Sequence, residues 1–156
     1  MKFAVPVFVV AVTLLTEARG VPPIQTITHE MALDAIMTFR VDPLSEDARQ
    51  AAAVVMQFVD QSHDVLVRIS TKTLPFVSNE SLPENYRATL VEAFVVGNID
   101  SQLLRHQKKD DSYAGLLQVF ETYRQMQRKN PKLRITEVEK FLEMQNRGGL
   151  KAYVSS

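Results

Sequence analysis

The sequence predicts an all-α protein, a single-domain bundle of about five amphipathic helices with no disulfides. Three observations predict this class. The chain has 156 residues and no cysteine, so no disulfide can hold the fold together. Apolar side chains recur at helical spacing in long segments between prolines, and no segment shows the alternation that is typical of a strand. Residues 21–156 are the part that remains once the predicted N-terminal leader is removed. They have the length of one domain and can bury a core without cross-links.

The leader is residues 1–20. Lys2 precedes a short apolar run, and small residues occupy the −3 and −1 positions of a cleavage site after Gly20. This layout is typical of a secretory signal peptide. The run is too short to cross about 30 Å of hydrocarbon and Pro6 interrupts it, so a transmembrane anchor is the weaker interpretation. We expect a secreted, extracellular protein without a transmembrane segment, whose helical bundle domain is residues 21–156.

The first helix is predicted to begin at Thr26 or Thr28, since both residues can serve as N-caps, and to end before Pro43. One face of this helix carries an apolar stripe, which should pack on the rest of the bundle. The stripe comprises Ile27, Met31, Ala32, Ala35, Ile36 and Phe39.

The longest periodic run, residues 45–73, contains neither glycine nor proline, and Ser45 is suited to cap it. A helix of this length would span roughly 40 Å, so we interpret it as the central rod of the bundle. Asp60 and Asp64 fall on its solvent side. Its buried seam advances in alternating steps of four and three through Ala48, Ala52, Val55, Val59, Ser62, Leu66 and Ile69.

A connection with a proline near each end, residues 74–83, follows the rod and should be ordered. It contains the triplet Asn79-Glu80-Ser81, which is an acceptor for N-glycosylation. The triplet is also common by chance. Its place in a loop and the predicted signal peptide favour its use, and we predict a glycan on Asn79.

The third helix should begin at Pro83 or Glu84, and the Gly-Asn pair at 97–98 is predicted to bend or split it. A polar connector over residues 105–111 leads to the fourth helix, which Asp111 or the serine after it should cap.

The fifth helix has a capping-box pattern, with Thr136 at the predicted N-cap and Glu139 three residues later. The glycine pair at 148–149 should end it, and the short amphipathic tail over 150–154 should fold back onto the bundle. The side chains predicted to be buried in this helix are Val138, Phe141, Leu142 and Gln145.

Charge is balanced over the chain, with 18 basic and 18 acidic residues, but not along it. Residues 21–104 carry 5 basic against 11 acidic side chains, and residues 105–156 carry 11 against 6. A basic surface is predicted around the turn at 130–131. It can meet anionic lipid head groups, glycosaminoglycans or an acidic partner, although a solvated turn that complements the helix dipole is the simpler interpretation. Its residues are Arg124, Arg128, Lys129, Lys132 and Arg134.

Catalytic and metal sites find little support in the sequence. The absence of cysteine excludes thiol catalysis, and there is neither a nucleophile elbow nor a phosphate-binding glycine loop. A metal site can be drawn from Asp60, His63 and Asp64, but it would need a ligand from a second helix, and a solvated polar face explains them better. We therefore expect no enzyme activity, no cofactor, no metal and, for a near-neutral secreted chain, no nucleic acid partner.

Two hypotheses for function remain. The first is a secreted, non-enzymatic helical binding protein that carries an apolar small molecule between its helices or associates with lipid surfaces, since seams rich in methionine and phenylalanine repack easily. The second is a secreted interaction protein that acts on a receptor, a host factor or another extracellular protein through its uneven charge and its basic turn.

Overall fold

The computed structural model describes residues 26–155, and the predicted signal peptide with its cleavage position lies outside the described residues. The predicted class is confirmed, because this range contains six α-helices, one 3-10 turn and no strand. The elements are α1 (His29–Val41), α2 (Glu46–Gln61), η1 (Pro75–Ser78), α3 (Glu84–Arg105), α4 (Ser112–Lys129), α5 (Thr136–Asn146) and α6 (Leu150–Ser155).

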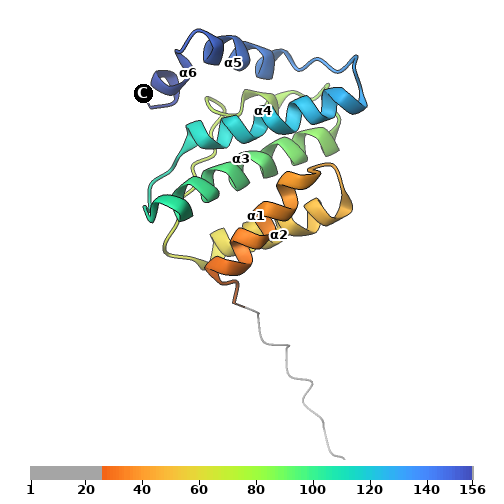
Figure 1. Cartoon of the computed structure of the whole chain (residues 1–156). Coiled ribbons are helices and arrows are strands. Elements are labelled where there is room, and N and C mark those ends of the chain that lie inside the picture. The colour runs from red at the N-terminus through yellow and green to blue at the C-terminus, as the bar shows by residue number, and fades with distance from the viewer. Residues whose placement is uncertain (1–25, 156) are drawn as a thin grey trace, which may run out of the picture.

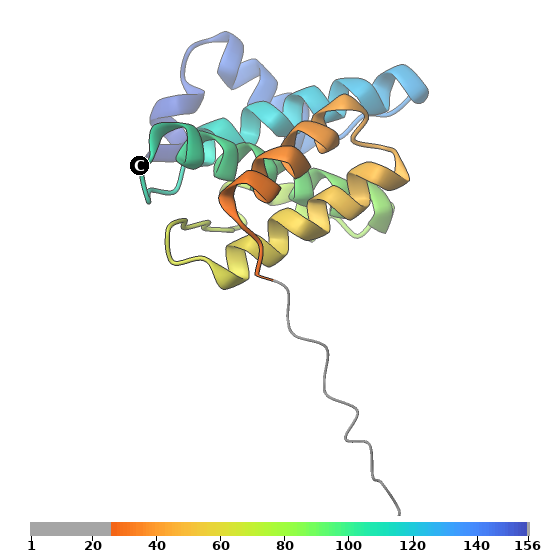
Figure 2. The same cartoon turned by 60° about the horizontal axis from the view of Figure 1, so that its bottom comes forward.

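The antiparallel pair α3 and α4 forms the centre of the bundle (Figure 1). The α1–α2 hairpin packs against α3 on one side of this pair, and α5 and α6 pack against α4 on the other. Figure 2, in which the bottom of this view comes forward, shows α1 and α2 side by side in opposite directions. The central rod of the protein is therefore α3 and not the 45–73 segment.

Both helices of the α1–α2 hairpin begin where their caps predict. The hydroxyl of Thr28 accepts a hydrogen bond from the Met31 N–H at 3.2 Å, and that of Ser45 accepts one from the Ala48 N–H at 3.0 Å. The apolar stripe of α1 is buried, apart from Met31, which is half-buried.

The prediction of one long helix over residues 45–73 is wrong, because α2 ends at Gln61. The Ser62 hydroxyl accepts a hydrogen bond from the Asp64 N–H at 3.0 Å, a local turn that competes with helix. The chain then runs without regular structure to residue 70, through residues rich in β-branched side chains, which favour extended backbone. We call residues 62–70 the strap.

The change of backbone at Ser62 also changes which side chains are buried. Val65 faces the core, whereas Leu66, which the helical period placed on the seam, is 37% exposed. Val55 is buried as predicted, and Asp60 and Asp64 are exposed as predicted.

The predicted split at residues 97–98 is also wrong, because α3 runs unbroken through Gly97. Here α4 approaches α3 so closely that Gly97 faces the backbone of Ala114 and Gly115. The missing side chain allows this contact between two helices, and the packing of α4 supports the helix where glycine alone would weaken it.

The capping box of α5 does not form. The helix begins at Thr136 itself, and Ile135 occupies the N-cap without a side-chain bond. Glu139 instead accepts hydrogen bonds from the Tyr123 hydroxyl at 2.7 Å and from the Gln127 amide at 3.2 Å. Burial and the hydrogen bond to Glu139 raise the pKa of Tyr123 to about 12, so this hydroxyl keeps its proton at physiological pH.

The end of α5 is as predicted. Gly148 has φ +74°, and the Gly149 N–H donates to the carbonyl of Met144 at 3.0 Å, which is a Schellman cap. The tail forms α6, which folds back against α4 and α5 and buries Leu150.

Candidate functional site: a cationic groove

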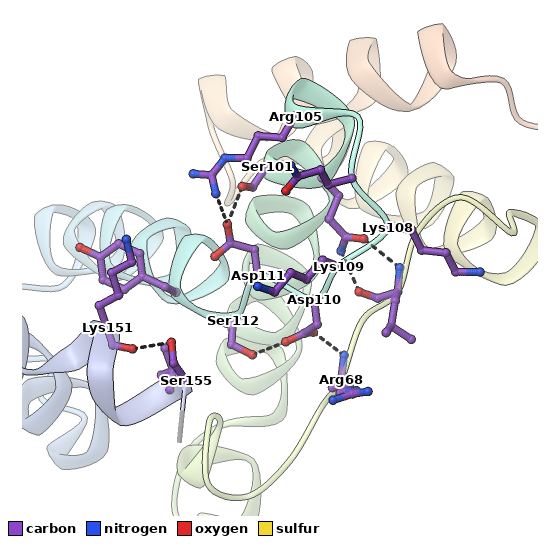
Figure 3. Close-up of a pocket in the computed structure, with 15 residues that line it drawn as sticks. Arg68, Ser101, Arg105, Lys108, Lys109, Asp110, Asp111, Ser112, Lys151 and Ser155 are labelled. Atoms are coloured by element: carbon purple, nitrogen blue, oxygen red, sulfur yellow. Dashed lines mark hydrogen bonds and ion pairs between the residues drawn. The ribbon is translucent and has the colours of Figure 1, made fainter.

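A groove of about 700 Å³ lies between the strap, the C-terminal end of α3, the connector to α4, and α6 (Figure 3). Five cationic side chains and only two carboxylates line it, although the chain as a whole is neutral. We call it the cationic groove. Its cations are Arg68, Arg105, Lys108, Lys109 and Lys151.

A buried polar network in α3 fixes the shape of this groove. Gln102, which is 3% exposed, donates to the Leu66 carbonyl at 2.7 Å and accepts from the Leu66 N–H at 2.9 Å. Its amide also donates to Asn98 Oδ1 at 2.7 Å, and that oxygen accepts the backbone N–H of Asp111 at 3.0 Å. One turn of α3 therefore holds both the strap and the start of α4.

The carboxylate of Asp110 accepts three hydrogen bonds from groups of the protein. Oδ1 accepts from the Arg68 backbone N–H at 2.7 Å and from the Asn98 amide at 3.0 Å. Oδ2 accepts from the Ser112 hydroxyl at 2.7 Å. Asp110 thus joins the strap to the connector, and its oxygens face groups of the protein itself.

The carboxylate of Asp111 also accepts hydrogen bonds from groups of the protein. It caps α4 by accepting the Ala114 N–H at 3.0 Å, and it also accepts the Ser101 hydroxyl at 2.6 Å and the Arg105 guanidinium at 3.2 Å. Burial pushes the pKa of Asp111 upward, but these hydrogen bonds and the charges of Arg105 and Lys151 outweigh burial, and the pKa is lowered. The carboxylate is therefore ionised at physiological pH.

The cations of the groove differ in how they are satisfied. Arg105 pairs with Asp111, and the Lys151 ammonium lies 5.9 Å from the centroid of the Tyr113 ring. The charged ends of Arg68, Lys108 and Lys109 have no hydrogen-bond or ion-pair partner in the described part of the chain.

Figure 3 shows that Arg68 and Lys108 point in different directions. The free cations therefore do not converge on one point, as they would around a single phosphate group. This arrangement suits a ligand with several separated negative charges.

The basic surface predicted from the sequence lies at the other end of α4 from the groove. Three of its five cations are already engaged: Arg124 pairs with Glu121, Lys129 lies 3.3 Å from Asp42, and Arg134 donates to two backbone carbonyls of the turn. Among residues 26–155, only Arg128 and Lys132 of this set have no such partner. Most of the cations without a partner that lie near one another are therefore in the cationic groove and not at this turn.

Sequence reasoning missed the cationic groove because its cations come from the strap, α3, the connector and α6. The adjacent Lys108 and Lys109 in a polar connector were the only local signal, and a lysine pair alone is common on protein surfaces. The sequence does not indicate the contribution of Arg68, because the apolar period predicts a helix through residues 62–70.

The three histidines lie on different segments. His29 is 3.2 Å from Asp64 and packs against the ring of Phe58 with 5.4 Å between centroids. Within the described residues, no group of three potential metal-ligating side chains is close enough to hold an ion. No helix in that range is both long and apolar enough to cross a bilayer.

Asn79 follows η1 and is half-buried. Its Nδ2 donates to Glu137 of α5 at 3.2 Å, and its Oδ1 accepts the Ser81 N–H at 3.1 Å. A glycan would be attached to the nitrogen that contacts Glu137. One N–H remains on a glycosylated amide, so the contact can persist.

We expect Asn79 to carry a glycan in material secreted by eukaryotic cells, because the acceptor triplet lies in a surface connection. Glycosidase treatment should increase gel mobility, and Asn79→Gln should abolish this change. Asn85→Gln is the control, since Asn85 is exposed and is not followed by the acceptor pattern. Equal mobility of the native protein before and after treatment would contradict the prediction.

Comparison of the chain with protein-family models, with curated proteins and with solved structures returned no match. The cationic groove is therefore interpreted from its own chemistry.

Proposed function

We propose that this protein is a secreted, non-enzymatic binding protein that holds an acidic segment of another extracellular protein in the cationic groove. One observation carries the proposal. The two carboxylates of the groove are already hydrogen-bonded within the protein, while Arg68, Lys108 and Lys109 have no partner in the described residues. These three cationic side chains can therefore pair with the negative charges of a ligand.

The walls of the groove favour a peptide segment over other polyanions. Leu66, Tyr113 and Val154 lie among the cations, and Leu66 is 37% exposed. A peptide can place apolar side chains on these residues and carboxylates on the cations. A sulfated polysaccharide offers little to the apolar walls, and a flat lipid surface does not enter a concave site.

An apolar ligand inside the bundle has less support. The largest core side chains, among them Phe39, Phe58, Phe94 and Tyr123, fill the space between the helices. The grooves described by residues of the strap, α3, α4 and the α1–α2 connection open at the surface and include charged side chains in their linings. A carrier would need the helices to separate first.

We expect a fluorescent peptide of alternating glutamate and leucine to bind the purified protein, and the same peptide with glutamine to bind at least about tenfold more weakly. The double variant Lys108→Glu/Lys109→Glu should weaken binding of the acidic peptide by a similar factor. The matched control is Arg128→Glu/Lys132→Glu, which reverses two exposed cations at the other end of α4 and should leave binding unchanged. Affinity should fall as salt is raised.

Three outcomes would contradict the proposal. Equal loss of affinity in the two double variants would show that net charge alone attracts the peptide. Binding of heparin or of anionic lipid vesicles without binding of the acidic peptide would assign the groove to another ligand. Equal affinity for the glutamate and glutamine peptides would show that charge is not recognised.

A further inference from the structure

The strap has two edges, and only one of them is hydrogen-bonded within the described residues. The side-chain amide of Gln102 bonds both the N–H and the carbonyl of Leu66, and Asp110 accepts the N–H of Arg68 at 2.7 Å (Figure 3). Residues two apart therefore face the same side, which is the geometry of an extended strand. Gln102 bonds Leu66 in the way that a neighbouring strand would.

The backbone N–H and carbonyl groups of Val67 and Ile69 point to the other side, because consecutive residues of an extended segment alternate. Within residues 26–155, these groups have no hydrogen-bond partner. Ile69 is 52% exposed, and the residues before and after it are exposed as well, so solvent and ligands can reach this side. We call the backbone groups of Val67 and Ile69 the open edge.

The open edge is held in its extended form before any partner binds. Gln102, which is 3% exposed, and Asp110 fix the opposite edge to α3 and to the connector. A ligand therefore does not have to order the strap, which lowers the entropic cost of binding. Only another extended backbone offers N–H and carbonyl groups at the matching spacing, and unpaired strand edges bind peptides in this way.

Arg68 selects the chemistry of the partner. Its guanidinium has no hydrogen-bond or ion-pair partner in the part of the chain that the structure describes. In an antiparallel pair, the residue opposite Arg68 occupies a non-hydrogen-bonded position, where side chains come close, so a carboxylate there would pair with it. Two straps paired around the same residue would place one Arg68 against another, and like charges directly opposite are destabilising. This favours an acidic partner over a second copy.

We propose that the open edge binds an extended, antiparallel segment of another protein, with an acidic residue opposite Arg68 and apolar or β-branched residues opposite Val67 and Ile69. These last two residues of the partner make the backbone hydrogen bonds. The proposal does not require the proposed function, because Val67 and Ile69 do not line the cationic groove.

Hydrogen exchange with a six-residue peptide of alternating glutamate and valine tests the proposal on the unmodified protein. We expect the amides of Val67 and Ile69 to exchange rapidly in the free protein and at least about tenfold more slowly at millimolar peptide. N-methylation of the valines removes the N–H groups that face the strap and should weaken binding about tenfold. N-methylation of the glutamates is the matched control, since these N–H groups point away, and affinity should be unchanged.

Ile69→Pro removes one N–H of the open edge, and proline is tolerated where the N–H of a strand faces solvent. We expect this variant to bind the peptide about fivefold more weakly or worse. Ile69→Thr is its control, because threonine keeps both the N–H and the branched side chain, and it should retain affinity. Circular dichroism checks that both are folded. If Ile69→Pro is not, the N-methylated peptides decide.

Unchanged exchange of Val67 and Ile69 at millimolar peptide would overturn the inference. If the peptide nevertheless binds and Lys108→Glu/Lys109→Glu abolishes this binding, the proposed function stands without the inference. Slower exchange that persists in that double variant supports the open edge whether or not the cationic groove is occupied. Equal affinities of the two N-methylated peptides would also overturn it. Slower exchange with rising protein concentration and no peptide would assign the edge to a second copy.

Discussion

Gly97→Val should lower the free energy of unfolding by about 3 kcal/mol or more, and Gly97→Ala by about 1–3 kcal/mol. A Cβ at position 97 would lie 2.6 Å from Gln118 Cβ, 2.7 Å from the Ala114 carbonyl oxygen and 3.2 Å from Gly115 Cα. The last two are backbone atoms of α4, so the clash cannot be relieved by rotating a side chain. The two central helices would have to move apart.

The expected loss of stability is opposite to the change that helix propensity predicts. Measuring Gly97→Ala therefore distinguishes the close helix contact from propensity. Alanine is favoured over glycine inside a helix by about 1 kcal/mol, so the sequence alone predicts that Gly97→Ala stabilises the protein. Urea denaturation followed by circular dichroism measures the difference. Gly149→Ala is the control, because its nearest neighbour is Met144 Cγ at an ordinary 3.5 Å, and it should be close to neutral. A stabilised Gly97→Ala protein would contradict the close helix contact.

The second large effect is expected for Gln102→Ala, which should lower the free energy of unfolding by about 2–4 kcal/mol. The substitution removes three hydrogen bonds at once, two to the backbone of Leu66 and one to Asn98. These partners are left at a largely buried site, and each unsatisfied group costs about 1–3 kcal/mol unless water reaches it. The strap would lose its attachment to α3.

Hydrogen exchange gives this prediction a local readout. The Leu66 amide should exchange faster in Gln102→Ala, while amides in the middle of α1 should change only in proportion to the global loss of stability. Gln107→Ala is the matched control, since Gln107 is exposed in the connector and makes only backbone hydrogen bonds. Unchanged protection of Leu66 in Gln102→Ala would mean that the strap is held by other contacts.

The sequence by itself determined the helical class, the starts of four helices, and the glycine end of α5. These features are local. Thr28, Ser45 and Asp111 cap the helices that follow them through bonds to an N–H three residues on, and Pro83 allows α3 to begin after it. The apolar period fixes which side of a helix is buried. Such signals act within a few residues, so they can be read before the fold is known.

Only the tertiary structure decided the course of the strap after α2, the continuity of α3 through Gly97, the cap of α5 and the cationic groove. Each depends on a partner distant in the chain. Gln102 binds the backbone of Leu66, which is 36 residues away in the chain. The Tyr123 hydroxyl donates to the carboxylate of Glu139, which the capping box would have used. A strap of β-branched residues and a helix have similar intrinsic energies, so a few long-range hydrogen bonds of about 1 kcal/mol each are sufficient to choose between them.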